Sequence, residues 1–181
     1  MKSRWLSLAI FSFALLNSSL PASRGNGPLP EFKFQKVALH PKDLVYSLNE
    51  DLIHPTIVKT EGRIKNPIGK YYLYHAPHKH IATSMACSDS IEGPWKEYKQ
   101  NPVVEGPSAP DVRWIEEKGK FYLWGHRKNS QTELWTSDDG IHFKYHSVSI
   151  KAQNIGTRNA TCSRMYEYPL EKYGSKYIML Y

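Results

Sequence analysis

The sequence predicts an all-β protein built from repeated four-stranded units. Short runs rich in aromatic and β-branched residues alternate with Gly, Pro, Asn and Asp, which is typical of strands joined by turns. Long helical periodicity is absent. The same pattern of residues also recurs about every 50 residues. Together these observations indicate an array of similar antiparallel sheets.

The first halves of two repeats match closely. One copy contains residues 54–59 (HPTIVK) and 69–74 (GKYYLY), and the next contains residues 109–114 (APDVRW) and 119–124 (GKFYLW). In each copy, a short strand that follows a proline leads through a Gly-Lys turn into an aromatic strand. This correspondence predicts a hairpin at the start of each repeat.

The second halves of the repeats also correspond. Residues 81–88 (IATSMACS) match 132–137 (TELWTS), and turns at 89–95 and 138–143 follow them. Four strands in about 50 residues is the repeat length of a β-propeller blade. The alternative is a meander or sandwich with similar hairpins.

A third, weaker copy spans residues 164–174 and continues into 176–181 (KYIMLY). It places Tyr72, Tyr122 and Tyr177 at intervals of 50 and 55 residues. The chain therefore contains about two and a half blades, whereas a propeller usually closes with at least four. We expect the sequence to be a fragment or a truncated gene product.

The N-terminus has the pattern of a secretory signal peptide. Lys2 and Arg4 form a basic start, residues 5–16 are apolar, and residues 17–23 are small and polar. The apolar run is shorter than the roughly 20 residues that a membrane-spanning helix needs. The sequence thus predicts a signal peptide over residues 1–23 and a secreted or periplasmic protein without a membrane span in its mature chain.

The rest of the chain divides into a leader and a repeat domain. Residues 24–52 form the leader, which is rich in Gly and Pro near its start, and residues 53–181 form the partial propeller. Without Lys2 and Arg4 the formal net charge of +7 falls to +5, and the basic residues are scattered. Nucleic-acid binding is therefore not expected.

Cysteine usage and metal motifs point to no cofactor. Cys87 and Cys162 are the only two cysteines, which is too few for a disulfide framework, and we expect isolated, half-buried thiols. No CxxC or HExxH pattern is present. His75, His78 and His80 lie close together in sequence, but a third ligand for a metal on one strand face is not evident, so we interpret them as polar residues of a loop.

Several motifs resemble those of glycoside hydrolase family 43 and related five-bladed propellers. Residues 109–112 (APDV), followed by 119–123 (GKFYL), resemble a blade motif of that group, and 90–95 (SIEGPW) resembles a turn that closes a blade. Residues 71–80 match a related branch of propellers. The resemblance covers roughly 53–181. It implies an incomplete five-bladed β-propeller that hydrolyses the O-glycosyl bonds of a polysaccharide or oligosaccharide.

The resemblance also implies a mechanism with carboxylates. Two carboxyl groups flank the glycosidic bond, and inverting enzymes hold them far enough apart for a water molecule. Asp111 is the candidate base or tuning carboxylate, with an Asx turn as its alternative. Glu167 is the candidate acid, although strict alignment puts Tyr166 opposite Asp111, and a surface carboxylate is the alternative. Glu105 is a second candidate acid. Some members of the family carry a calcium ion in the channel.

The first repeat departs from the family pattern. Catalytic members carry Asp just before the first proline, where this chain has His54, and Thr56 stands opposite Asp111. Three interpretations remain. His54 does unusual work, the base comes from sequence outside this chain, or the protein binds a glycan without cleaving it. A structural or interaction propeller without a sugar site is a remoter alternative.

The hairpin pattern predicts where a glycan would bind. If the first strand of each repeat leads away from the mouth of a funnel, the second returns to it, so the loops after Tyr74 and Trp124 lie at the mouth. Trp124 and Trp135 could stack on a sugar, although packing within the blade is the alternative. The candidate glycan-binding residues are His54, His78, His80, His126 and Arg127.

Overall fold

The computed structural model describes residues 31, 33–46 and 51–181. The chain divides into two compact units, residues 1–35 and 36–181, and the fold below is that of the second. The predicted signal peptide and residues 24–30, 32 and 47–50 of the leader lie outside the described residues. Within the described part, no helix is both long and apolar enough to cross a membrane.

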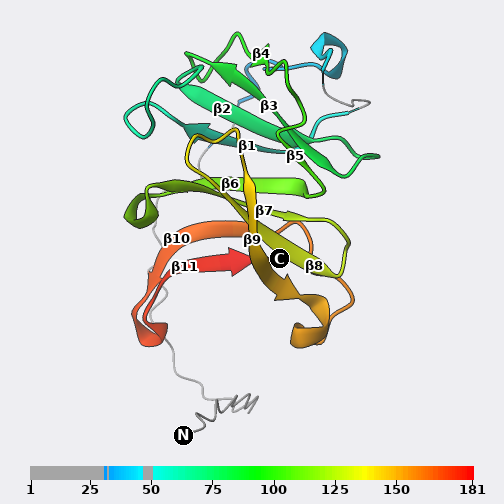
Figure 1. The fold of residues 1–181 in the computed structure, drawn as a ribbon, viewed down its shortest axis with the longest axis vertical. Helices are drawn as coiled ribbons and strands as arrows, with labels where there is room; N and C mark the ends of the chain where they lie inside the picture. The colour runs from blue at the N-terminus through cyan, green and yellow to red at the C-terminus, as the bar shows by residue number, and fades with distance from the viewer. Residues whose placement is uncertain (1–30, 32, 47–50) are drawn as a thin grey trace, which may run out of the picture. The chain divides into compact units, whose positions relative to one another are not determined.

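The described chain is all-β, as predicted, and its sheets are antiparallel (Figure 1). The first sheet has the order β1 (Ile53–Lys59), β2 (Tyr71–Ala76), β3 (Ala82–Ser88) and β4 (Lys96–Glu97), with β5 (Val104–Glu105) also paired to β3. The second sheet has the order β6 (Ser108–Ile115), β7 (Lys120–His126), β8 (Gln131–Ser137) and β9 (Lys144–Lys151). β10 (Arg164–Leu170) and β11 (Ser175–Leu180) form a hairpin. Short 3₁₀ turns are η1 (Pro41–Asp43), η2 (Glu116–Lys118), η3 (Ala152–Ile155) and η4 (Glu171–Tyr173).

The predicted Gly-Lys turn is seen in the second sheet, and its counterpart joins the strands of the hairpin. Gly119 and Gly174 end η2 and η4 in the left-handed conformation, with φ of 57° and 59°. Glycine adopts this conformation without the steric penalty of a Cβ atom, so the chain can reverse directly into the aromatic strand. The turn chemistry of the sequence therefore fixes where each of these hairpins closes.

The fourth strand of the first sheet is split into two short pieces. β4 pairs with one end of β3 and β5 with the other. Between them, the side-chain amide of Asn101 accepts a hydrogen bond from the backbone N–H of Met85 and donates one to its carbonyl oxygen, both at 2.9 Å. The amide thus supplies the two bonds that a continuous strand would have made.

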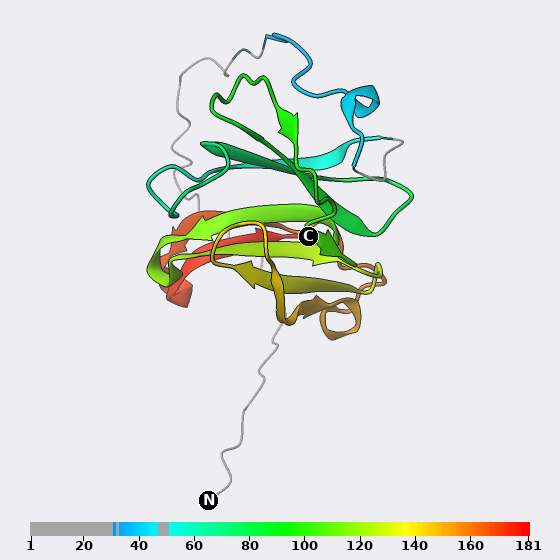
Figure 2. The ribbon, with the colours of Figure 1, turned by 45° about the horizontal axis from the view of Figure 1, so that its top comes forward.

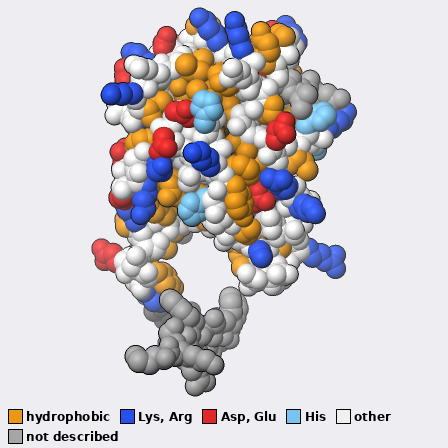
Figure 3. All heavy atoms as spheres, in the orientation of Figure 1, with side chains coloured by type: hydrophobic (Ala, Val, Ile, Leu, Met, Phe, Trp, Pro, Cys, Tyr) orange, Lys and Arg blue, Asp and Glu red, His pale blue; other side chains and the backbone are white. Residues whose placement is uncertain are grey.

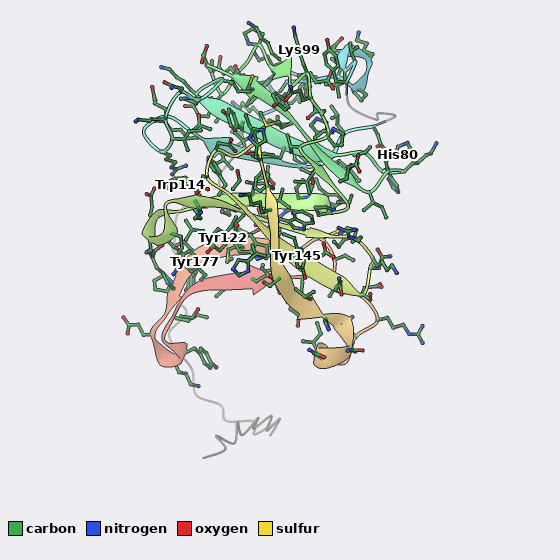
Figure 4. All side chains as sticks on the ribbon, viewed as in Figure 1. His80, Lys99, Trp114, Tyr122, Tyr145 and Tyr177 are labelled. Carbon is green, nitrogen blue, oxygen red and sulfur yellow. The ribbon has the colours of Figure 1, made fainter. Side chains whose placement is uncertain are left out.

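The two large sheets stack face to face, as Figures 1 and 2 show. Strand side chains alternate between the two faces, so Tyr72 and Tyr74 point to the second sheet while Leu73 points away from it. The core between the sheets consists of Val58, Tyr72, Tyr74, Met85, Val104, Val112, Phe121 and Leu123. The second sheet and the hairpin share another core, in which Tyr122 and Tyr177 lie close together (Figure 4).

Two equivalent threonines fasten each sheet to the loop that leads into the next one. Thr83 of β3 donates a hydrogen bond to the carbonyl of Pro107 at 2.9 Å, and Thr132 of β8 donates one to the carbonyl of Ala160 at 2.9 Å. Both threonines are buried. The repeat seen in the sequence is therefore also a repeat of contacts between sheets.

Charged side chains are spread over the surface. Figure 3 shows Lys and Arg side chains scattered over the viewed face rather than gathered in one patch. A dispersed distribution is what a solvated surface requires, and it lacks the continuous basic stripe that nucleic-acid binding uses.

Candidate functional site

The first strands of the repeats begin beside the loops that follow the second strands. Ile53 at the start of β1 lies opposite Ala76 at the end of β2, and Ser108 lies opposite His126 in the same way. The loops after β2 and β7 therefore lie with the starts of β1 and β6, as the sequence predicted. We call this region the inner-strand end.

Three residues without the freedom of glycine hold left-handed backbone at this end. His54, Ala109 and Cys162 have φ of 51°, 51° and 54°. In β1 and β6, the pairing register shifts across this same position. Such conformations are sparsely populated for residues that carry a Cβ atom, cost about 1 kcal/mol or more, and cluster at functional sites. The strain marks the start of each first strand as the place to look for function.

The left-handed residues also define which positions of the repeats are equivalent. Two residues beyond them stand Thr56, Asp111 and Arg164. The Thr56 hydroxyl donates to the carbonyl of Pro110 at 2.8 Å, and one Asp111 oxygen accepts from the backbone N–H of Met165 at 2.7 Å. Each side chain thus bonds to the backbone beside its counterpart in the next repeat.

This equivalence corrects the alignment of the third repeat. Counting back from Tyr177 put Tyr166 opposite Asp111, but the structure puts Arg164 there. The reason is a register shift in β10 between Glu167 and Leu170, which adds a residue that spacing alone does not reveal.

Asp111 is fully buried, and both of its carboxylate oxygens are engaged. One oxygen accepts hydrogen bonds from the Arg113 side chain, at 3.1 Å from Nε and 3.0 Å from Nη2, and the other accepts from Met165. The carboxylate therefore joins the second sheet to the hairpin instead of closing a local Asx turn. Its catalytic role remains a prediction.

Glu167 lies in a different setting. Its side chain is 63% exposed and pairs with Lys176 of β11 at 3.1 Å. Lys176 also bonds Glu117 of the second sheet. No hydrogen bond in the described part of the chain joins Glu167 to Asp111, so the role of Glu167 as an acid also remains a prediction.

Several polar side chains gather at the inner-strand end. The Cys162 thiol lies 3.9 Å from Nε2 of His54. Burial, the charge of Arg164 and then His78 lower the pKa of His54, and burial and His54 lower the pKa of His126. Both imidazoles are therefore favoured in the neutral form, which can donate one hydrogen bond and accept another. We call His54, His78, His126, Cys162 and Arg164 the inner-strand cluster.

Two neighbouring groups complete this cluster. Asp51 accepts a hydrogen bond from the backbone N–H of His78 at 2.7 Å, and its other oxygen lies 3.7 Å from Nδ1 of that residue. Nδ1 of His126 is buried and has no hydrogen-bond partner. His78 is thus oriented by a carboxylate, while His126 retains hydrogen-bonding capacity.

A second group of candidates lies in the neighbouring loops. His80, Glu105 and Arg127 line a hollow of about 420 Å³, and Figure 4 shows His80 in the loop between β2 and β3. Gly106 has a φ of 112°, and a Cβ atom there would lie 2.5 Å from the Arg127 guanidinium. Only glycine allows Arg127 this close approach. Arg127 also lies 3.5 Å from the buried carboxylate of Glu133.

The three histidines after β2 therefore separate in space. His75 is buried and neither of its ring nitrogens has a hydrogen-bond partner, whereas His78 joins the inner-strand cluster and His80 lines the hollow. Over the described ranges, no three His, Cys, Asp or Glu side chains are placed to hold a metal ion. The interpretation of these histidines as one metal site gains no support.

The two tryptophans considered for stacking pack inside the protein. Trp124 is 4% exposed and lies in the core shared with the hairpin, and Trp135 packs edge-on against Tyr145. Cys87 and Cys162 are free thiols, half-buried and exposed respectively.

Arg164 was missed from the sequence. The first two repeats announce their inner strands with His54-Pro55 and Ala109-Pro110, but the third has Cys162-Ser163 and no proline. The signal that could have found it is the loop: Ala160 stands two residues before Cys162, as Pro107 does before Ala109.

Comparisons with known proteins give little beyond the fold. No model of a known protein family matches the chain, and no curated protein matches it. Among solved structures, it is similar to Zg3597, a family 117 glycoside hydrolase produced by the marine bacterium Zobellia galactanivorans, with a TM-score of 0.39 and 21% identity over 45% of this chain. The chain covers 24% of that structure. Membership of family 43 is not shown.

Proposed function

We propose that this chain is part of a carbohydrate-active β-propeller and that its inner-strand end binds a glycan. The observation that carries the proposal is the convergence of His54, His126 and Arg164 at the strained starts of the first strands. The motif resemblance to five-bladed glycoside hydrolases supports the same conclusion, as does the stacking of four-stranded sheets in sequence order.

The chemistry of the inner-strand cluster suits sugar hydroxyls. A neutral imidazole offers a donor and an acceptor, and a guanidinium offers several donors. A sugar hydroxyl can pair with either kind of group. Because sites with a few fixed polar groups gain specificity from leaving none of them unpaired, these side chains would select hydroxyl orientation.

The proposal is tested by glycan binding. Affinity electrophoresis against a panel of neutral and acidic polysaccharides should retard the wild-type chain, and calorimetry then gives its affinity for the best ligand. His54→Ala and His126→Ala should each weaken binding by about tenfold, because each removes a hydrogen bond in a half-buried setting. The matched control is His146→Ala, since His146 is an exposed histidine of β9. Absence of binding to the whole panel, or equal loss in the control, would contradict the proposal.

Hydrolysis is a second candidate function, favoured by Asp111. Its carboxylate is buried at the inner-strand end, where the family motif places a base or tuning group. Inverting cleavage would need a second carboxyl roughly 6.5–9.5 Å away, and we propose Glu167 as the acid. Glu105, beside the hollow, is the alternative acid.

Substitution of the proposed acid tests hydrolysis. Glu167→Gln should lower turnover of activated aryl glycosides and polysaccharides by 100-fold or more, in line with the usual contribution of a general acid, which is about 10²–10⁴. Glu92→Gln, at an exposed position in the turn before Trp95, is the control. Asp111→Asn should also lower turnover, and its thermal unfolding must be measured because the carboxylate anchors the hairpin. Unchanged turnover in both variants would remove these roles, and NMR of the first product would reveal the anomer.

A further inference from the structure

Arg164 is held at the inner-strand end by neutral groups. Its Nη1 atom donates to the carbonyl oxygens of Ala109 at 3.4 Å, Pro110 at 3.2 Å and Ser163 at 3.2 Å. Three carbonyls on one nitrogen fix the plane and position of the guanidinium. Among the described residues, no carboxylate forms an ion pair with Arg164, although its side chain is partly buried.

The carboxylates nearest to this position are already engaged. Asp111 is bound by Arg113 and by the backbone of Met165. Asp51 is bound by the backbone N–H of His78 and lies beside its ring. Each negative charge at the inner-strand end thus has its own partner, which leaves the Arg164 charge without a compensating one.

A partly buried cation without a counter-ion favours an anionic ligand. Taking a charge out of water is unfavourable unless an opposite charge accompanies it, and the rest of the guanidinium fork matches the paired oxygens of a carboxylate or sulfate. The neighbouring imidazoles of His54 and His126 can donate further hydrogen bonds to such a group. The inner-strand cluster therefore has the composition of an anion-binding site.

We infer that the inner-strand end selects an acidic glycan, with a uronate carboxylate or a sugar sulfate bound to Arg164. This inference rests on the proposed function and deepens it, because it names the class of sugar. The same geometry would bind either anion, so the experiment has an arm for each.

The experiment compares matched ligands that differ in charge. Calorimetry with the full chain would use hexagalacturonic acid, its fully methyl-esterified form, and a sulfated hexasaccharide of the same length. The wild type should bind at least one of the two anionic hexasaccharides about tenfold more tightly than the neutral ester. Raising the salt concentration should weaken that binding and leave any binding of the ester unchanged.

Variants assign the preference to Arg164. Arg164→Gln should abolish the tenfold preference, and Arg164→Lys should retain only part of it, because lysine keeps the charge and loses the fork. The matched control is Arg63→Gln, since Arg63 lies in the connection between β1 and β2 and bonds the carbonyl of Lys59 at 2.8 Å. Thermal unfolding shows whether each variant is folded. If Arg164→Gln is not, the salt dependence of the wild type and Arg164→Lys decide the question.

The outcomes separate the two proposals. Tighter binding of an anionic ligand that depends on Arg164 supports the inference, and the arm that binds identifies carboxylate or sulfate. Equal affinity for the acid, the sulfate and the ester would overturn the inference and leave glycan binding standing. Failure of all three ligands, and of the wider polysaccharide panel, would overturn the proposed function together with the inference.

Discussion

At the scale of single residues, His75 of β2 is the least satisfied polar group in the described chain. It is fully buried, neither ring nitrogen has a partner, and burial lowers its pKa to about 4, against a small opposing effect of Glu97. The fold therefore accepts only the neutral imidazole. Apolar neighbours, Leu39, Leu52 and Leu73 among them, line the hollow beside the ring.

This burial makes stability depend on pH. A lowered pKa means that the unfolded chain takes up the proton first, so the contribution is fully present above about 6.5 and is lost as pH falls towards 4. The loss is roughly 3 kcal/mol by pH 4. Urea unfolding of wild type and His75→Leu at pH 7, 5.5 and 4 should show the variant losing less stability on acidification. Parallel curves for the two proteins would contradict this account.

Residues also show how far sequence reasoning reaches. The sequence identified His54, His78, His80, His126 and Arg127, and the structure divides them between the inner-strand cluster and the hollow. The division could not be predicted, because consecutive residues such as His126 and Arg127 point to different sides of a strand end. Nor could the anchoring of Asp111, since its partner Met165 lies 54 residues away.

At the scale of elements, the threonines that end each sheet hold the next connection in place. Thr132 bonds both the Ala160 carbonyl at 2.9 Å and the Ser163 hydroxyl at 2.8 Å, and all three residues are buried. These bonds position the loop from which Cys162 and Arg164 extend. The third strand of one sheet thus determines where the first strand of the next begins.

Thr132→Val should therefore loosen the start of β10. The substitution keeps the shape and leaves two buried partners unsatisfied, which costs about 1–3 kcal/mol. Hydrogen exchange should become faster across residues 157–164. The control is Thr136→Val on the same face of β8, since Thr136 has no side-chain hydrogen bond within the described residues. Equal exchange in the two variants would mean that the bond does not hold the loop.

The elements themselves were predicted well where turn chemistry was clear. Both Gly-Lys hairpins and the matching strands of the two large sheets follow from the pattern of aromatic residues and glycines. The third repeat was misaligned because its register shift lies in the exposed residues between Glu167 and Leu170, where neither composition nor spacing marks it. Arg164 escaped notice for that reason.

At the scale of the folded unit, the stacking of the two large sheets depends on a contact between Tyr74 and Gly140. The buried Tyr74 hydroxyl donates to the Gly140 carbonyl at 2.7 Å, and burial raises the pKa of Tyr74 well above its usual value. Gly140 has a φ of 75°, and a Cβ atom there would lie 2.8 Å from that hydroxyl. The β8–β9 turn and the first sheet therefore meet with no room for a side chain.

Gly140→Ala should destabilise the protein by about 2 kcal/mol or more, because it adds backbone strain to a steric clash. Tyr74→Phe alone should cost about 1 kcal/mol through the lost hydrogen bond. In a double-mutant cycle measured by chemical denaturation, the combined loss should be smaller than the sum, since removing the hydroxyl relieves the clash. Additive losses would show that the two residues do not oppose each other across the sheets.

The hydrogen bonds between sheets share a direction along the chain, and this has a consequence for synthesis. Thr56, Tyr74, Thr83 and Thr132 each donate to a residue that comes later in the sequence. When a ribosome has made only the first sheet, its buried donors still await their acceptors, which follow some 24 to 66 residues behind. Because domains form from the N-terminal side as the chain emerges, we expect each completed sheet to serve as the template that captures its successor. A pause in translation within one repeat would leave the preceding sheet with unpaired groups exposed to chaperones.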